Sequence, residues 1–118
     1  MVKDANYKEE RPWGSFEILH EENQMKVKKI ILHPGKRLSL QSHRFRSETW
    51  VMVQGMAMVK LENEDIPLTK NETVFISAEA KHRISNRGQE DVVFIEVQTG
   101  SYLGEDDIQR FEDDFNRV

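Results

Sequence analysis

The sequence predicts an all-β domain, and three observations carry this prediction. Short segments in which apolar and polar residues alternate follow one another closely, and turn residues separate them. No internal repeat, low-complexity stretch or linker divides the chain. Many short strands at even spacing are typical of a sandwich or a barrel. With 118 residues, the chain fits a single domain over residues 1–118 whose core can bury most of its apolar surface.

The predicted strands lie in the central part of the chain. In Met25–Leu32, apolar residues mix with three lysines, which is typical of a half-exposed strand. Turn residues follow at His33-Pro34-Gly35, and Asn63–Asp65 is predicted to form a hairpin turn. The full set of predicted strands is Met25–Leu32, Leu38–His43, Trp50–Gln54, Met56–Leu61, Ile66–Leu68, Thr73–Ser77, His82–Asn86 and Val92–Val97.

The two ends of the chain have different patterns. Ile108, Phe111 and Phe115 are spaced as on one face of a helix, and acidic residues precede them where a helix dipole favours acids. A short C-terminal helix is therefore predicted over residues 104–117. Residues 1–10 are charged and lack the apolar core of a signal peptide, so we expect them to form a flexible or edge-pairing arm.

Composition narrows the classes of function. The chain has no Cys, so a metal would need His, carboxylate or amide oxygen as ligands. Absence of Cys fits the cytosol, and we expect a cytoplasmic protein. The net charge of −4 argues against a nucleic-acid partner. No apolar run approaches the ~20 residues of a membrane helix, so no membrane partner is expected.

One polar stretch, Leu38–Gly55, holds the strongest candidates for chemistry. Side chains two apart on a strand share a face, so Gln41 and His43 point the same way. A hairpin could place Glu48 beside them, and His82 opens a strand of its own. These four side chains could form a first-row metal site with open positions for a substrate. The spacing equally allows an ordinary solvated face, and the residues alone leave both interpretations open.

Two segments resemble the paired motifs of the cupin fold. Gly35-x5-Gln41-x-His43-x4-Glu48-x6-Gly55 resembles the first motif, with Gln41 in place of the usual first His. The second motif is matched around His82, with non-glycine residues where the motif usually has turn residues. Its matched positions are Asn71, Ser77, Glu79, His82 and Asn86, of which the first three replace Gly, Pro and Gly.

Four segments together resemble the type II phosphomannose isomerases. They are Arg11–Glu17, Leu38–Gly55, Lys81–Asn86 and Gly100–Phe115, in the order and spacing of that family. The resemblance implies a single cupin barrel, also called a double-stranded β-helix or jelly roll. It also implies that Gln41, His43, Glu48 and His82 bind a divalent metal ion, which is Zn or else Mn, Co or Ni. Analogy with small cupins further predicts a homodimer.

The implied activity is metal-dependent interconversion of mannose 6-phosphate and fructose 6-phosphate through a cis-enediol, feeding GDP-mannose and polysaccharide biosynthesis. Arg46 matches the family as a catalytic and substrate-binding residue, and Lys81 and Arg83 match as substrate-binding residues. The base is sought on the last predicted strand, where Glu96 shares a face with Gln98. Glu96 is either that base or a carboxylate paired with a Lys.

A second function remains open, because three positions depart from the family. Arg44, Phe45 and Thr49 stand where relatives often have His. The chain would then be a non-catalytic module that binds a sugar phosphate and partners a separate mannose-1-phosphate guanylyltransferase. An iron oxygenase is a third class, against which Gln41 argues, because such sites usually hold more His.

Overall fold

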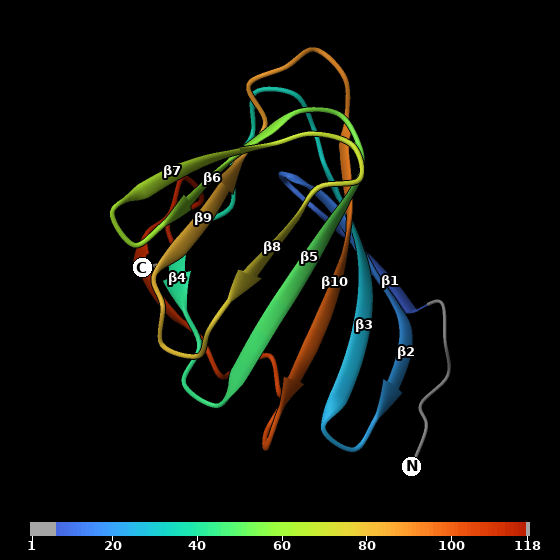
Figure 1. The fold of residues 1–118 in the computed structure, drawn as a ribbon, viewed down its shortest axis with the longest axis vertical. Coiled ribbons are helices and arrows are strands. Elements are labelled where there is room, and N and C mark those ends of the chain that lie inside the picture. Colours follow the sequence, from blue (N-terminus) through green and yellow to red (C-terminus); the bar gives the residue numbers. More distant parts are fainter. Residues whose placement is uncertain (1–6, 118) are drawn as a thin grey trace.

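The computed structural model describes residues 7–117, which form strands and no helix that could cross a membrane. Two antiparallel sheets lie face to face (Figure 1), so the predicted all-β barrel is confirmed. The six-stranded sheet has the order β1 (Tyr7–Arg11), β2 (Gly14–Glu22), β3 (Met25–Leu32), β10 (Val92–Gly100), β5 (Arg46–Gln54) and β8 (Thr73–Ile76). The five-stranded sheet has the order β11 (Gln109–Glu112), β4 (Leu40–Ser42), β9 (His82–Ser85), β6 (Ala57–Leu61) and β7 (Glu64–Leu68).

The inner face of the six-stranded sheet changes in character along its strands. Near one end of the barrel its side chains belong to the apolar core, and toward the other end they are charged or polar yet still buried. The apolar members are Ile30, Leu32, Trp50, Met52, Val92 and Phe94, and the polar members are Lys26, Lys28, Arg46, Glu48, Glu96 and Gln98. Buried charges are costly unless they are paired, so this polar end is the natural place for a functional site.

The pairing of strands brings the polar members together. Glu96 on β10 lies opposite Lys28 on β3 and opposite Trp50 on β5, and Gln98 lies opposite Glu48. Because residues two apart share a face, the buried acids and bases of three neighbouring strands meet inside the barrel. The lysines of β3 therefore correct the expectation of a half-exposed strand, since Lys26 and Lys28 point inward.

The predicted C-terminal helix is wrong. Residues 109–112 form β11, which pairs with β4, and Phe115 packs against the core. The three-and-four spacing of apolar residues was a weak signal, and backbone pairing with an open sheet edge overrides it. At the other end, residues 1–6 of the predicted arm lie outside the described residues. Its remainder begins β1, an edge strand paired with β2.

Two of the departures from the second cupin motif lie at tight turns. Asn71 and Glu79 replace glycines and adopt left-handed backbone conformations, with φ of 72° and 69°. Asn is among the residues that tolerate this region, whereas Glu79 is held there by its N–H, which donates to the carbonyl oxygen of His43 at 2.6 Å. The turns of the motif are therefore built without its glycines.

Candidate functional site

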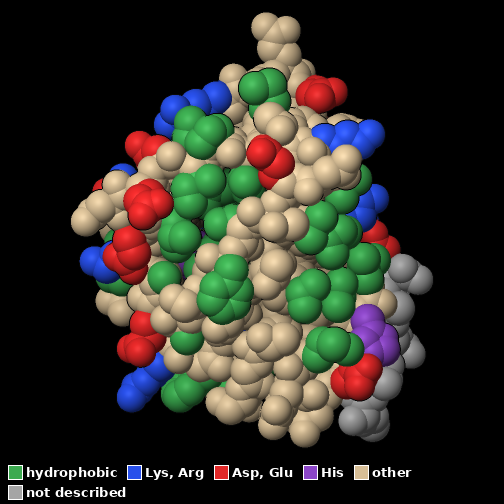
Figure 2. All heavy atoms as spheres, in the orientation of Figure 1, with side chains coloured by type: hydrophobic (Ala, Val, Ile, Leu, Met, Phe, Trp, Pro, Cys, Tyr) green, Lys and Arg blue, Asp and Glu red, His purple; other side chains and the backbone are tan. Residues whose placement is uncertain are grey.

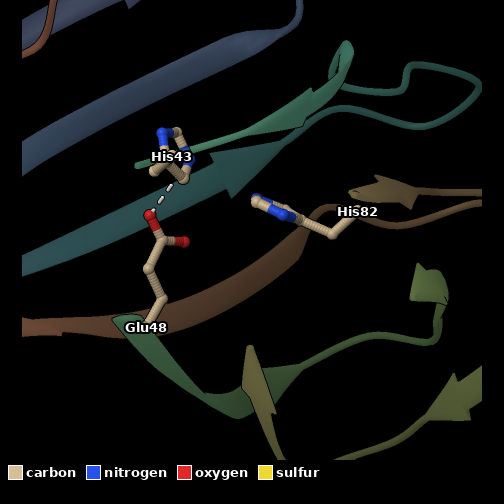
Figure 3. A group of neighbouring side chains, drawn as sticks. All are labelled: His43, Glu48 and His82. Atoms are coloured by element: carbon tan, nitrogen blue, oxygen red, sulfur yellow. Dashed lines mark ion pairs between the residues drawn. The ribbon is translucent and has the colours of Figure 1, made fainter. Parts of the chain in front are cut away.

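Three buried side chains converge inside the barrel from separate segments (Figure 3). His43 follows β4, Glu48 lies on β5, and His82 begins β9. Each offers one ligand atom, and these atoms all lie within 4.8 Å of one another. His43 Nε2 lies 3.3 Å from a carboxylate oxygen of Glu48. Two imidazoles and one carboxylate are a donor set that suits a first-row divalent ion.

Backbone carbonyls fix the tautomers of both histidines. His43 Nδ1 lies 2.7 Å from the carbonyl oxygen of Asp107, and His82 Nδ1 lies 2.9 Å from that of Ala80. A carbonyl oxygen can only accept, so each Nδ1 carries the proton and each Nε2 keeps its lone pair. Histidine ligands of metals are commonly oriented by such a second partner.

The charge states also suit metal binding. Burial lowers the pKa of His43 to about 4, and burial likewise lowers the pKa of His82. Both imidazoles are therefore neutral near pH 7. Burial alone would raise the pKa of Glu48, but the nearby Arg46 outweighs it and holds the pKa below its usual value. The carboxylate is thus charged, as a ligand must be.

Gln41 contributes to the same cavity as Glu48 and His82. It lies opposite His82 in the pairing of β4 with β9. Its amide nitrogen donates to the hydroxyl of Ser39 at 2.9 Å. That bond uses the donor end of the amide, which leaves the oxygen as the available ligand atom.

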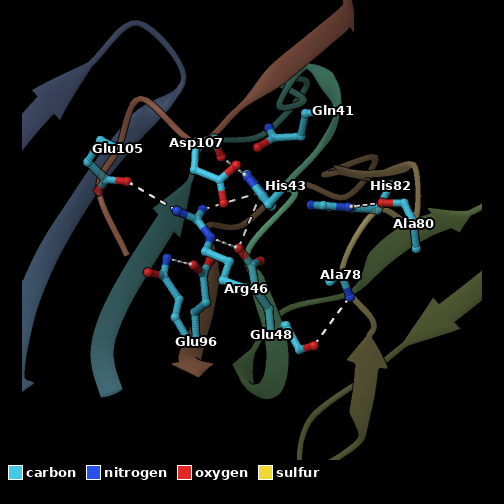
Figure 4. A network of polar contacts seen from close by, with 12 residues as sticks. Gln41, His43, Arg46, Glu48, Ala78, Ala80, His82, Glu96, Glu105 and Asp107 are labelled. Carbon is cyan, nitrogen blue, oxygen red and sulfur yellow. Dashed lines mark hydrogen bonds and ion pairs between the residues drawn. The ribbon is translucent and has the colours of Figure 1, made fainter. Parts of the chain in front are cut away.

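Arg46 lies between the histidine–glutamate group and the rest of the cavity (Figure 4). Its Nε donates to Glu48 at 2.8 Å, and one terminal nitrogen lies 3.3 Å from His43 Nε2. The other terminal nitrogen, Nη1, is buried without a hydrogen bond. Arg46 thus contacts two of the atoms that an ion would use, and its Nη1 forms an ion pair with Glu105 at 3.5 Å.

Glu96 is a second buried carboxylate with a different charge state. Burial and then the negative charge of Glu48 raise the pKa of Glu96 to about 7, while Lys28 and Arg46 partly oppose this rise. The amide of Gln98 donates to it. A carboxyl group that titrates near neutral pH is suited to take and return a proton.

One cavity of about 290 Å³ is lined by Gln41, Arg46, Glu48, His82 and Glu96. His43 does not line it. This volume lies at the small end of small-molecule sites, which run from roughly 300 to 1,000 Å³. Apolar walls come from Trp13, Phe16, Ile30, Leu38 and Ile84. Trp13 packs in the core, and its Nε1 is buried without a partner among the described residues.

A group of arginines lies on the lining of the same cavity. Arg11 comes from β1, Arg110 from β11 and Arg117 from the C-terminal segment. Burial lowers the pKa of Arg110, and the like charges of Arg117 and Arg11 lower it further. The Nε of Arg110 is buried without a hydrogen-bond partner. Arg11 is paired with Glu9 at 2.9 Å and Arg117 with Asp113 at 2.6 Å, whereas Arg110 Nε is a donor that no described residue uses, and it suits an anion such as a phosphate.

The structure brings some predicted residues to the cavity and leaves others outside. Arg83 lines it, with its guanidinium held by the carbonyl oxygen of Leu38 and by Glu112. Lys81 does not line it: as the neighbour of His82 it points away, and its ammonium lies 4.4 Å from the ring centroid of Phe111.

The three departures from the family pattern also lie outside the cavity. Arg44 and Phe45 are exposed in a turn, and Thr49 is on the outer face of β5, between the inward-pointing Glu48 and Trp50. Their side chains are therefore not part of the cavity lining.

Several lining residues were not anticipated from the sequence. The strand alternation of Met25–Leu32 could have identified Lys28, which shares a face with Ile30 and Leu32. No local signal could have joined Arg11 to Arg110, because they meet through long-range contacts.

Comparison with known proteins gives close relatives. The family described as "Mannose-6-phosphate isomerase C-terminal" matches residues 2–113. The alginate biosynthesis protein AlgA of Pseudomonas aeruginosa is 45% identical over 108 residues, covering 92% of this chain and 22% of AlgA. The mannose-1-phosphate guanylyltransferase ManC of Salmonella typhimurium is 43% identical, again with 92% and 22% coverage. The chain thus spans less than a quarter of the length of these curated relatives.

Solved structures support the fold. The capsular polysaccharide assembling protein CapF of Staphylococcus aureus superposes with a TM-score of 0.78 at 23% identity, over 89% of this chain and 34% of CapF. A Klebsiella pneumoniae protein with a double-stranded β-helix domain gives 0.72 at 21% identity, over 82% of this chain and 83% of that protein. With the match over residues 2–113, the chain belongs to the family of mannose-6-phosphate isomerase C-terminal domains, built on the cupin fold.

Proposed function

We propose that the chain is a metal-dependent mannose-6-phosphate isomerase, which interconverts mannose 6-phosphate and fructose 6-phosphate. The observation that carries the proposal is the presence of Glu96, with a pKa of about 7, in the cavity that also holds Glu48 and His82. An isomerase of this kind needs one group that both removes and returns a proton. Family membership supports the choice of substrate.

In this proposal Glu96 acts as the base. Its carboxylate takes the proton from C2 of open-chain mannose 6-phosphate, which leaves an enediolate with its charge on O1. A proton passes from the hydroxyl on C2 to O1 through the cis-enediol, and Glu96 gives its proton to C1 to form fructose 6-phosphate. Gln41, His43, Glu48 and His82 would hold a divalent ion, which is Zn or else Mn, Co or Ni. When bound, such an ion supplies Lewis-acid stabilisation to a developing oxyanion. Arg46, whose Nη1 is ion-paired with Glu105 at 3.5 Å but has no hydrogen bond among the described residues, binds an oxygen near the reacting carbons.

The phosphate binds at the other part of the cavity. Arg11, Arg110 and Arg117 present guanidinium donors there, and Arg110 Nε has no partner among the described residues. Guanidinium groups match the geometry of phosphate oxygens better than ammonium groups do. Arg83 lines the same cavity and is a further candidate, whereas Lys81 needs a different rotamer or a partner to take part.

The proposed substrate also indicates the pathway in which the protein would act. The relatives AlgA and XanB are alginate and xanthan biosynthesis proteins, and ManC is a mannose-1-phosphate guanylyltransferase. We place this chain in the cytoplasm, at the step that supplies mannose 6-phosphate for GDP-mannose and polysaccharide biosynthesis.

One observation favours a second function, that of a non-catalytic sugar-phosphate-binding module partnering a separate guanylyltransferase. Arg46 already contacts His43 Nε2 and Glu48, so the site has a cation without any metal. A cavity in which Arg46 already pairs with the buried carboxylate could bind a sugar phosphate without catalysing its isomerisation.

A coupled assay with mannose 6-phosphate separates the two functions. We expect turnover in protein loaded with Zn, Mn, Co or Ni and loss of turnover after chelation. His82→Ala should lower metal stoichiometry and turnover together, because His82 is buried and its Nε2 faces the other ligands. The control is His33→Ala, an exposed histidine paired with Asp91, which should retain both. Binding of mannose 6-phosphate by metal-replete protein without turnover would favour the module instead.

A further inference from the structure

Two lysines of β3 are buried inside the barrel, and they have different surroundings. Lys26 is 4% exposed, and its ammonium donates to the carbonyl oxygen of Leu103 at 2.9 Å and lies 3.7 Å from Glu21. These partners compensate the buried ammonium. Without them, its removal from water would cost several kcal/mol. Lys26 does not line the cavity, so it serves as an internal structural cation.

Lys28 is 6% exposed and does line the cavity. On the neighbouring strand it lies directly opposite Glu96, the proposed base. Its ammonium lies 4.7 Å from the ring centroid of Phe16 and is paired with the carboxylate of Glu105. The ammonium of Lys28 therefore lies beside the proposed base, and its ion-pair partner, Glu105, belongs to a loop.

Glu105 spans two buried cations while half of its side chain remains exposed. One of its oxygens pairs with Lys28, and the other lies 3.5 Å from Arg46 Nη1, the nitrogen that has no hydrogen bond (Figure 4). It belongs to the segment between β10 and β11, which forms neither helix nor strand. Burial would raise the pKa of Glu105, but Lys28 holds it below the usual value, so the carboxylate is charged.

We propose that Lys28 and Arg46 together bind the oxygen that becomes negatively charged in the enediolate, and that Glu105 occupies this position in the free protein. The inference rests on the proposed isomerase function, since it names the part of the substrate that these cations contact. A preorganised cation beside a developing oxyanion lowers the barrier, because the charge forms where a partner is already in place. The exposed carboxylate gives way because water can solvate it once the substrate oxygen replaces it.

Two ligands test the proposal by calorimetry. Arabinonate 5-phosphate carries a carboxylate at the end that corresponds to the reacting carbons, and arabinitol 5-phosphate has the same phosphate but no charge at that end. Lys28→Met should weaken binding of the arabinonate roughly 10- to 100-fold, the range for a lost charge-assisted hydrogen bond, and leave the arabinitol nearly unchanged. Glu105→Gln should tighten binding of the arabinonate, because it removes a competing anion.

Matched variants separate binding from folding. Lys26→Met removes the other buried lysine of the same strand and face. It should not change the ratio of the affinities for the two ligands. Lys28→Arg keeps the cation and should recover most of the selectivity for the arabinonate. The proposal is overturned if Lys28→Met weakens both ligands equally, if Lys26→Met shows the same selectivity, or if the wild-type protein binds neither ligand. Selective binding without isomerase turnover would instead overturn the proposed function, and of this inference it would leave only that Lys28 and Arg46 bind an anionic oxygen at this position.

Discussion

At the scale of single residues, Glu96 shows how its surroundings decide the chemistry of a carboxyl group. Glu48 and Glu96 are both buried on neighbouring strands, yet Arg46 holds the pKa of Glu48 low, whereas burial and Glu48 raise that of Glu96. Two acids with pKa values pushed apart are suited to different roles. The first can bind a metal as a carboxylate, and the second can exchange a proton near neutral pH.

Glu96→Gln should reduce kcat by about 10²- to 10⁴-fold, the usual contribution of a general base. In the wild-type protein, kcat/KM should rise with pH along an acid limb at or below pH 7, because a bound cation would lower this pKa further. A pH–rate profile checks both effects. Glu17→Gln, on β2 outside the cavity, is the control and should keep the wild-type profile.

The same variant has a separate effect on stability. The pKa of Glu96 in the folded protein lies above the ordinary 4.5, so the stability that its protonated form provides is complete below that value and is lost as the pH rises through about 7. Urea unfolding of metal-free protein should therefore show less loss of stability on going to alkaline pH in Glu96→Gln than in the wild type. Equal losses would show that Glu96 is not the buried acid described here.

At the scale of elements, the segment after β10 closes one end of the barrel in place of the predicted helix. The carboxylate of Asp107 accepts hydrogen bonds from the backbone N–H groups of Arg44 and Phe45, both at 2.9 Å. The carbonyl oxygen of the same residue accepts from His43 Nδ1. One residue thus fixes the turn that follows β4 and the orientation of a proposed ligand.

Asp107→Ala should lower the free energy of unfolding by about 1 kcal/mol, because it removes the carboxylate that accepts from two part-buried backbone N–H groups. It should also weaken metal binding, because the backbone carbonyl that accepts from His43 Nδ1 remains in the variant but is no longer held in place by the turn. Chemical denaturation and metal titration measure the two effects. Asp106→Ala is a close control, since the Asp106 carboxylate bonds the exposed hydroxyl of Tyr102. Equal effects of the two variants would contradict the role given to Asp107.

The strands themselves could be predicted to different degrees. Met25–Leu32 was predicted with its observed bounds, because its apolar residues alternate between two clear turns. β2 was missed, and β1 was expected only as the edge-pairing alternative for residues 1–10, since charged residues interrupt the apolar pattern of both, as they do in YKEER. The same limitation made β11 look helical, because a short edge strand carries too few apolar residues to reveal a period of two.

At the scale of the whole molecule, the sequence indicated the candidate metal ligands better than the rest of the cavity. His43 and Glu48 lie close together in the chain, so a local motif could place them near each other. Lys28 reaches Glu96 only through the register of β3 with β10, and Arg110 reaches Arg11 through the closing of the barrel. Register and closure depend on contacts across the whole chain, which local spacing does not contain.

The predicted homodimer concerns the outer face of the six-stranded sheet. Hydrophobic side chains gather on the face seen in Figure 2, over which β5, β8 and β10 run. On the outward-pointing side of β8 and β5, Phe75 is 60% exposed and Val53 is 44% exposed. Exposed apolar patches on a sheet favour association, and one patch meeting its own copy gives a closed pair. We therefore expect the second copy of this chain to cover this face.

Sedimentation at micromolar concentration should show a dimer. Phe75→Lys should dissociate it, because the substitution places a charge from each copy on the apolar face that the two copies would bury. Met56→Lys is the control: Met56 is 67% exposed but follows Gly55 at the end of the barrel, away from this face, so the dimer should persist. A wild-type protein that sediments only as a monomer would contradict the expectation. Because the cavity is lined from inside the barrel, Phe75→Lys should leave the affinity for mannose 6-phosphate unchanged even where it separates the two copies.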